Sequence, residues 1–172
     1  MDKMKLITYC LIIFLLFSKN SFAQLIDSIH YSWEVFELEE EIEGELEPVK
    51  RCYVISKPKN TNSNYTANRD PYISVTRFRD ERNEEITISS GYEYKISSKI
   101  YVLVGKKPFF FFTRGNSAWL DSAQKDKAFI QEMLKSDFVK VRSDSSLGSY
   151  SVDEYSLKGF ARAYKRMKKL CQ

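Results

Sequence analysis

The chain of 172 residues carries 27 lysines and arginines against 23 aspartates and glutamates, a formal net charge of +4, with one histidine and three cysteines. This length suits one domain with a sizeable apolar core, and the near balance of charge argues against a nucleic-acid-binding protein. A single histidine without clustered cysteines argues against a metal centre, because a metal site needs several converging ligands.

The N-terminal segment MDKMKLITYCLIIFLLFSKNSFAQ has the three parts of a cleavable secretory signal. A basic start with Lys3 and Lys5 precedes an apolar run from Leu6 to Phe17, and Ser21-Phe22-Ala23 supplies small residues before a cut. An apolar run of about a dozen residues is shorter than the roughly 20 needed to span a bilayer. We therefore expect cleavage after residue 23 and a single exported domain over residues 24–172. Its formal charge would be about +2, because the signal removes three lysines and one aspartate.

From residue 24 to residue 112, apolar and polar side chains mostly alternate, as is typical of half-buried strands. Residues 57–64 are predicted to form a polar surface loop, and residues 105–108 a tight hairpin. Residues 53–55 are apolar on both faces, which favours a central strand, and the contiguous run Phe109 to Phe112 favours a strand buried on both faces. The predicted strands are 29–38, 50–56, 72–78, 85–90, 100–104 and 109–113.

After residue 116 the apolar spacing becomes helical. Ala128, Phe129, Met133 and Leu134 would share one face of a helix over residues 122–135. Strands are predicted at 138–141 and 150–155, and Ser156 is predicted to cap a C-terminal helix. We therefore predict a mainly β fold, a β-sandwich or open barrel with two flanking α-helices, the second at the C-terminus.

Two segments are strongly charged. Eight glutamates lie between Glu34 and Glu47, and a basic stripe follows one side of the C-terminal helix. We interpret both as solvated faces, with a partner or membrane-headgroup site as the alternative for the stripe. The stripe consists of Lys158, Arg162, Lys165, Arg166 and Lys169.

The sequence contains none of the motifs expected of a hydrolase, a nucleotide-binding enzyme or a dinucleotide-binding enzyme. A Cys–His nucleophilic pair would require His30 to lie beside a thiol. The acidic pairs Asp80 with Glu81 and Asp153 with Glu154 are neighbours, and adjacent strand residues point to opposite faces. We interpret both pairs as solvated surface residues and expect no enzymatic activity, no metal and no cofactor.

Cys171 could be a reactive thiol, a metal ligand or half of a disulfide. It continues an apolar stripe opposite the basic one, so its sulfur should point inward. Cys52 lies on the most apolar strand, and an oxidising compartment lets two thiols pair and persist. We predict a Cys52–Cys171 disulfide, with a reactive thiol near the helix lysines as the alternative. The stripe is Leu157, Phe160, Tyr164, Met167 and Cys171.

A series of short motifs occurs along the chain in a fixed order. They are Cys52-Tyr53, Arg69-Asp70-Pro71, Gly91-Tyr92, Phe111-Phe112-Thr113 with Ala118-Trp119, residues 153–160 (DEYSLKGF), and Cys171. Together they resemble the invasion-associated locus B family of exported Gram-negative bacterial proteins, over residues 33–171. The chain departs from that family at Ser136, where members tend to have glycine, and in its dense glutamate segment. The resemblance implies a periplasmic or surface-associated β-sandwich with a role in host-cell entry and no catalytic residue to transfer.

We therefore expect an exported, non-enzymatic protein, periplasmic or secreted, that acts through protein or envelope contacts in host-cell interaction or envelope stress. The alternative is a binding module in which the phenylalanine-rich strands and Trp119 line a pocket for a small apolar or lipid ligand. We also expect an unidentified protein or envelope partner, no nucleic acid, no membrane span and a monomer.

Overall fold

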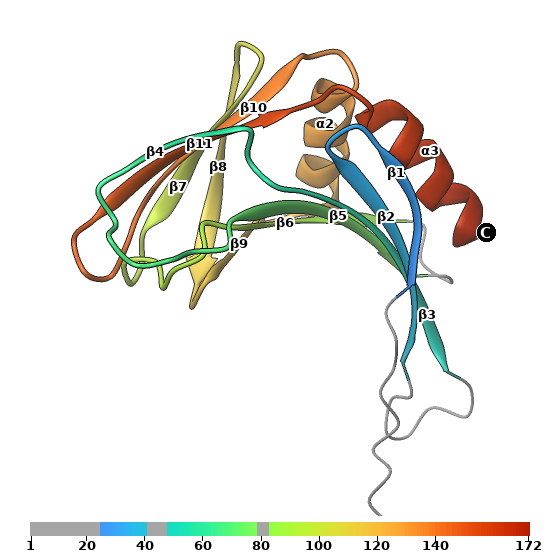
Figure 1. Ribbon diagram of the computed structural model, residues 1–172, viewed down its shortest axis with the longest axis horizontal. Coiled ribbons are helices and arrows are strands. Elements are labelled where there is room, and N and C mark those ends of the chain that lie inside the picture. The colour runs from blue at the N-terminus through green and yellow to red at the C-terminus, as the bar shows by residue number, and fades with distance from the viewer. Residues whose placement is uncertain (1–24, 41–47, 79–82) are drawn as a thin grey trace, which may run out of the picture.

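The computed structural model describes residues 25–40, 48–78 and 83–172 (Figure 1). The predicted signal at 1–23, the glutamates at positions 41–47 and the acidic pair at positions 80 and 81 lie outside these ranges.

Within the described ranges, eleven strands form one antiparallel sheet, and two helices complete the fold. The strand order is β1-β2-β3-β5-β6-β9-β8-β7-β10-β11-β4. The strands are β1 (Leu25–His30), β2 (Trp33–Glu40), β3 (Val49–Ser56), β4 (Asn60–Ser63), β5 (Tyr72–Phe78), β6 (Glu84–Ser89), β7 (Lys99–Val104), β8 (Lys107–Arg114), β9 (Ser117–Trp119), β10 (Phe138–Asp144) and β11 (Tyr150–Ser156). The helices are α2 (Ala123–Met133) and α3 (Phe160–Leu170).

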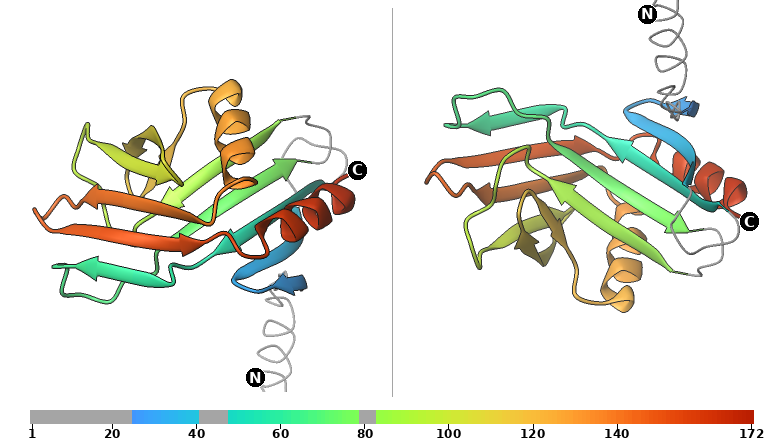
Figure 2. Two further views of the ribbon diagram at one scale, coloured as in Figure 1. Left: turned by 90° about the horizontal axis from the view of Figure 1, so that it is seen from above. Right: turned by 90° about the horizontal axis from the view of Figure 1, so that it is seen from below.

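The sheet is strongly curled, and both helices lie on the same side of strands β5 and β6 (Figures 1 and 2). The mainly β fold with two helices, the second at the C-terminus, is confirmed. Because the strands form one sheet with β1 and β4 as its two edges, the open barrel describes it better than the sandwich. The apolar strand β3 is central, as predicted, between β2 and β5.

The core fills the space between the curled sheet and the helices. From α2, Phe129 inserts edge-on between Phe109 and Phe111 of β8, at ring-centroid distances of 4.9 and 5.2 Å. From α3, Phe160 packs on Trp33 of β2 at 4.7 Å, and both side chains are fully buried. Burying aromatic side chains of this size supplies much of the apolar contact that holds each helix on the sheet.

The first predicted strand, 29–38, is wrong as a single element. It is two strands, β1 and β2, joined by a two-residue turn at Tyr31 and Ser32. The turn contains no glycine, asparagine or proline, so the sequence carries no turn signal there. Tyr31 takes a φ of 58°, which is uncommon for a large side chain. Its ring is covered by Lys158 at 4.4 Å and Arg162 at 5.5 Å, which hold the turn against α3.

The predicted cap of the last helix is also wrong. Ser156 ends β11, and its carbonyl accepts a hydrogen bond from Trp33 Nε1 at 2.9 Å. The helix is capped by Gly159 instead, with a φ of 93°. A Cβ at this position would collide with the backbone carbonyl of His30, so the β1–β2 turn can lie over the start of α3 only because residue 159 is glycine.

Two further strands were not predicted. The polar stretch expected to be a surface loop contains β4, which pairs with β11 at the edge of the sheet. An edge strand can be polar because its side chains stay solvated, so it lacks the usual alternation. Strand β9 has only three residues, too few for a periodic signal.

Candidate functional site

The structure joins Cys52 and Cys171 in a disulfide with a Cα–Cα distance of 5.9 Å across 119 positions of the chain. Both residues are fully buried. The bond connects the end of α3 to the central strand β3, as predicted. Neither sulfur is a free thiol, so neither forms a nucleophilic pair with His30. The ring Nε2 of His30 instead lies 3.2 Å from Ser28 Oγ.

The basic stripe divides into two groups. Arg166 donates two hydrogen bonds to Asp27 of β1, at 2.6 and 2.8 Å. This contact lowers the pKa of the Asp27 carboxyl. Together with Lys158 and Arg162 over Tyr31, Arg166 fastens β1 to α3, although all stripe residues except the half-buried Arg166 are exposed. The solvated face therefore stays a prediction for the stripe, with a partner or membrane-headgroup site as the alternative.

Within residues 25–40, 48–78 and 83–172, no three histidine, cysteine or acidic side chains converge in a way that could hold a metal ion. In the same ranges, no helix has the length and apolar character needed to cross a bilayer.

The interpretation of Asp153 as a solvated residue is wrong, because its side chain is fully buried. Arg69, from the segment before β5, binds both carboxylate oxygens, with Nη2–Oδ1 at 2.6 Å and Nη1–Oδ2 at 2.7 Å. Thr61 of β4 and Ser151 donate further hydrogen bonds to Asp153, at 2.5 and 3.1 Å. Arg69 also donates to the carbonyl of Ser90 at 3.0 Å. The hydrogen bond to Asp153 raises the pKa of Arg69, against the opposing effect of burial.

The Arg69–Asp153 pair adjoins a buried chain of hydroxyl groups. The Tyr92 hydroxyl lies 2.8 Å from Ser143 Oγ and 2.9 Å from Ser151 Oγ. Nearby, the Tyr94 hydroxyl donates to Ser90 Oγ at 3.0 Å, and burial raises the pKa of Tyr94. These side chains are at most 5% exposed. Because these side chains are buried, a substrate in solvent cannot reach them, and we assign the cluster to the folded core.

The phenylalanine-rich strand β8 is not buried on both faces, contrary to the prediction. Phe109 and Phe111 enter the core, whereas Phe110 is 61% exposed and Phe112 43% exposed. Tyr101 on β7 pairs directly with Phe110, ring to ring at 5.6 Å, and is 41% exposed. Trp119 on β9 pairs with Phe112 at 5.8 Å. We call these four side chains, Tyr101, Phe110, Phe112 and Trp119, the aromatic face.

Cationic side chains of strands β7, β8 and β10 lie beside the aromatic face. Lys99 pairs with Phe112, and Arg142 of β10 pairs with Tyr101. Arg114, at the end of β8, is also exposed. The outer surface of these strands therefore combines a rigid aromatic centre with a basic margin.

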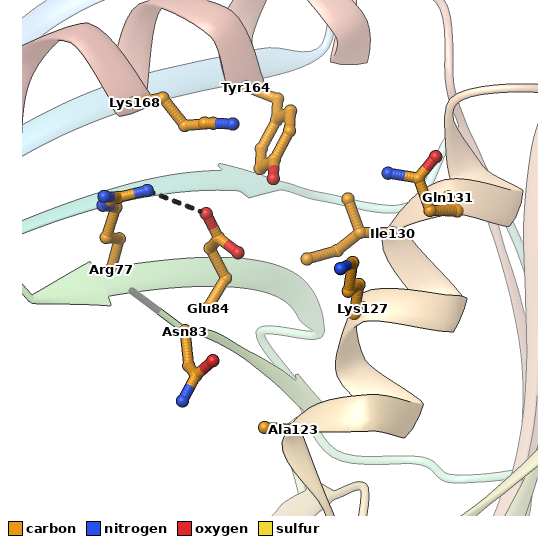
Figure 3. A pocket seen from close by; sticks show the side chains of 9 residues that line it. All are labelled: Arg77, Asn83, Glu84, Ala123, Lys127, Ile130, Gln131, Tyr164 and Lys168. Carbon is orange, nitrogen blue, oxygen red and sulfur yellow. Dashed lines mark hydrogen bonds and ion pairs between the residues drawn. The ribbon is translucent and has the colours of Figure 1, made fainter. Parts of the chain in front are cut away.

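A cleft of about 380 Å³ separates the two helices above strands β5 and β6 (Figure 3). Strands supply Arg77 and Glu84, which form an ion pair at 3.1 Å. Helix α2 contributes Lys127, Ile130 and Gln131, and helix α3 contributes Tyr164 and Lys168 (Figure 3). Asn83 and Ala123 complete the lining.

Tyr164 is a hydrogen-bond donor in this cleft. Burial raises its pKa to about 12, assisted by the nearby charge of Glu84 and a hydrogen bond to that carboxylate. The hydroxyl thus stays protonated and donates to Glu84. Arg77 binds the same carboxylate, so Glu84, the acidic side chain among the described lining residues, is neutralised by a neighbouring arginine.

Beside this cleft, Asp126 of α2 is only 6% exposed and accepts a hydrogen bond from the backbone N–H of Ile86 at 3.0 Å. Burial raises its pKa from the ordinary 3.8 to about 6, and the charges of Glu85 and Asp121 add to that effect. The folded state therefore binds this proton more tightly than the unfolded state does. Between about pH 4 and pH 6, the free energy of unfolding should fall as pH rises.

We expect Asp126→Asn to remove this slope while keeping an acceptor for Ile86. As pH rises from 4 to about 6, the melting temperature of the variant should increase relative to that of the wild type. Between pH 6 and pH 7 the difference between the two melting temperatures should stay constant. Asp137→Asn, at an exposed position outside α2, is the control and should follow the wild-type profile. Parallel profiles for Asp126→Asn and the wild type would contradict the raised pKa.

No family model, curated protein or solved structure matches this chain. The aromatic face, the cleft and the Arg69–Asp153 pair all escaped the sequence analysis. Only the aromatic face had a local signal, because strict alternation along residues 109–112 would have placed two of the four phenylalanines outside the core.

Proposed function

We propose that this is an exported, non-enzymatic protein of the invasion-associated locus B type that binds a protein partner through its aromatic face. The observation that carries the proposal is the exposure of Tyr101, Phe110 and Phe112 at 41%, 61% and 43% on one continuous sheet surface. Isolated exposed apolar residues are common, but a contiguous group of large aromatic rings marks an interaction site.

The chemistry of the aromatic face favours a protein over a lipid surface. Its rings lie within strands and contact one another across β7, β8 and β9, which restricts their motion. Tyrosine, tryptophan, phenylalanine and arginine are the side chains enriched at the centres of protein interfaces. Lys99 and Arg114 at the margin suit a partner with acidic side chains around an apolar centre, whereas Arg142 already pairs with Asp144 at 3.5 Å.

Further observations support the other parts of the proposal. Arg69 pairs with the buried carboxylate of Asp153, and Cys52 and Cys171 form a disulfide. These groups therefore have structural partners, which supports the non-enzymatic part of the proposal. Motifs that carry the family resemblance also meet in space. A Cβ on Gly91 would come within 2.5 Å of the backbone nitrogen of Asp70, so the glycine permits the Arg69–Asp70 segment to lie against it.

The alternative function, a module for a small apolar or lipid ligand, required the phenylalanine-rich strands and Trp119 to line a pocket. Phe109 and Phe111 instead pack on Phe129 in the core, and the other rings lie on the aromatic face. The cleft between the helices contains none of them. The geometry therefore favours the contact function.

A photo-crosslinking amino acid at position 110, in protein expressed in its native host, tests the proposal. We expect a discrete adduct with one protein, absent when the same group is placed at Leu147, which is 79% exposed elsewhere. Binding of the identified partner in purified form should then weaken about 30-fold or more in Phe110→Ser, because aromatic residues at interface centres contribute about 2 kcal/mol or more. The melting temperature of Phe110→Ser should stay close to that of the wild type.

Three results would count against the proposal. Unchanged partner affinity in Phe110→Ser would remove the aromatic face from the interface. Adducts to lipid alone would indicate an envelope surface as the partner. An apolar small molecule retained in native mass spectrometry of the exported protein would favour the binding-module alternative. Sedimentation of the purified protein tests the predicted monomer independently.

A further inference from the structure

The cleft between α2 and α3 contains more positive charge than its own residues neutralise. Among the described lining residues, Arg77, Lys127 and Lys168 face one carboxylate, Glu84, which Arg77 already pairs with (Figure 3). Among the residues that the structure describes, neither lysine has a carboxylate partner. The ammonium group of Lys168 lies 5.3 Å from the Tyr164 ring centroid. Two ammonium groups from different helices therefore border one concave space, and no carboxylate of residues 25–40, 48–78 or 83–172 pairs with either of them.

We infer that this cleft is a binding site for a small organic anion, held through its carboxylate or phosphate group. The inference concerns a second site, since none of the aromatic-face residues lines the cleft. Two ammonium groups that converge from opposite sides suit an oxyanion, because each donates several hydrogen bonds to it. The side-chain amide of Gln131 provides a further donor at the margin (Figure 3).

The remaining lining residues indicate the size of the ligand. A volume of about 380 Å³ is at the lower end of the range of small-molecule sites, so the ligand is a metabolite-sized molecule, smaller than a peptide or a lipid. Ile130 and Ala123 of α2 present apolar atoms that would contact a short carbon skeleton. The cleft thus fits a compact molecule with one strongly anionic end and a small apolar part.

The walls of the cleft are fixed before any ligand binds. Helix α3 is attached to β3 by the Cys52–Cys171 disulfide, and Cys171 Sγ also contacts the carbonyl oxygen of Arg77 at 3.6 Å. On the opposite wall, Asp126 binds the backbone N–H of Ile86 and holds α2 against β6. A preformed cationic site loses little conformational freedom on binding, which favours affinity for a small ligand.

Titration of the purified, disulfide-bonded protein with inorganic phosphate and, separately, with succinate tests the inference. Both titrations are run at one pH and at an ionic strength kept constant with sodium chloride. We expect at least one probe to raise the melting temperature saturably and to shift the NMR signals of Ile130 and Tyr164. A response to phosphate alone would identify a phosphate-bearing ligand class, and a response to succinate alone a carboxylate-bearing one.

The double variant Lys127→Gln/Lys168→Gln should weaken probe binding by about 10-fold or more. Lys135→Gln/Lys165→Gln makes the same change in net charge at two exposed lysines outside the cleft and should bind as the wild type does. The absence of a saturable response to both probes would overturn the inference. Equal weakening in the two double variants, or none in the cleft variant, would also overturn it, because the anion would then respond to overall charge or bind elsewhere.

Discussion

Replacing Cys52 with serine is expected to lower the free energy of unfolding by about 2–4 kcal/mol. The bond closes a loop of 119 positions, and the chain-entropy model assigns roughly 4.7 kcal/mol to a loop of that order. For a domain of this size, the expected loss corresponds to a fall in melting temperature of roughly 5–15 °C. Differential scanning calorimetry and urea denaturation of the oxidised wild type and the variant measure it.

The loss should be localised as well as large. Helix α3 packs on β1, β2, β3 and β5 but is covalently held only at its end, so hydrogen exchange of its amides should accelerate most in Cys52→Ser. Ala163→Ser is a suitable control, because Ala163 is a fully buried residue of the same helix and the change adds a hydroxyl without breaking the bond. Alkylation of both thiols in native protein from an oxidising compartment would contradict the disulfide itself.

The disulfide was predictable because its two signals are local. The apolar stripe of the last helix directs Cys171 inward, and the apolar run around Cys52 identifies a central strand, so only their pairing required a guess about the fold. Most strands and both helices were predictable on similar grounds, since alternation and helical spacing depend on neighbours in the sequence.

The missed features depend on residues that are distant in the sequence. Asp153 and Arg69 are 84 positions apart, and nothing beside Asp153 distinguishes a buried carboxylate from a solvated one. Lys127 and Lys168 each look like ordinary surface lysines on an amphipathic helix, and they border one cleft only because both helices lie on the same side of the sheet (Figure 2). The turn at Tyr31 is stabilised by cations from α3, so its cause is tertiary too.

The second large effect is expected at the buried Arg69–Asp153 pair. Asp153→Ala should lower the free energy of unfolding by about 3–5 kcal/mol, because it leaves the Arg69 guanidinium, only 9% exposed, without its counter-charge. Thr61 and Ser151 lose their acceptor in the same variant. Urea denaturation measures the loss. Asp121→Ala, which breaks the exposed Asp121–Lys125 pair, should leave the urea midpoint close to that of the wild type.

A double-mutant cycle separates the value of the pair from the cost of breaking it. Arg69→Met and Asp153→Leu should each destabilise strongly, whereas the double variant should recover much of the loss, because no charge is then buried alone. Additive losses would show that each side chain acts through separate contacts, such as the bond from Arg69 to the Ser90 carbonyl.

Recovered stability need not mean a recovered structure. Strand β4 pairs only with β11, and Thr61 ties it to both Asp153 and Arg69, so the pair fixes this edge strand in its register. In the double variant we expect amides of β4 to exchange faster while those of β3 and β5 keep their protection. Unchanged protection in β4 would mean that backbone pairing with β11 suffices. Loss of protection in β4 alone would show that the buried ion pair serves mainly to position the edge strand and adds little to the net stability of the fold.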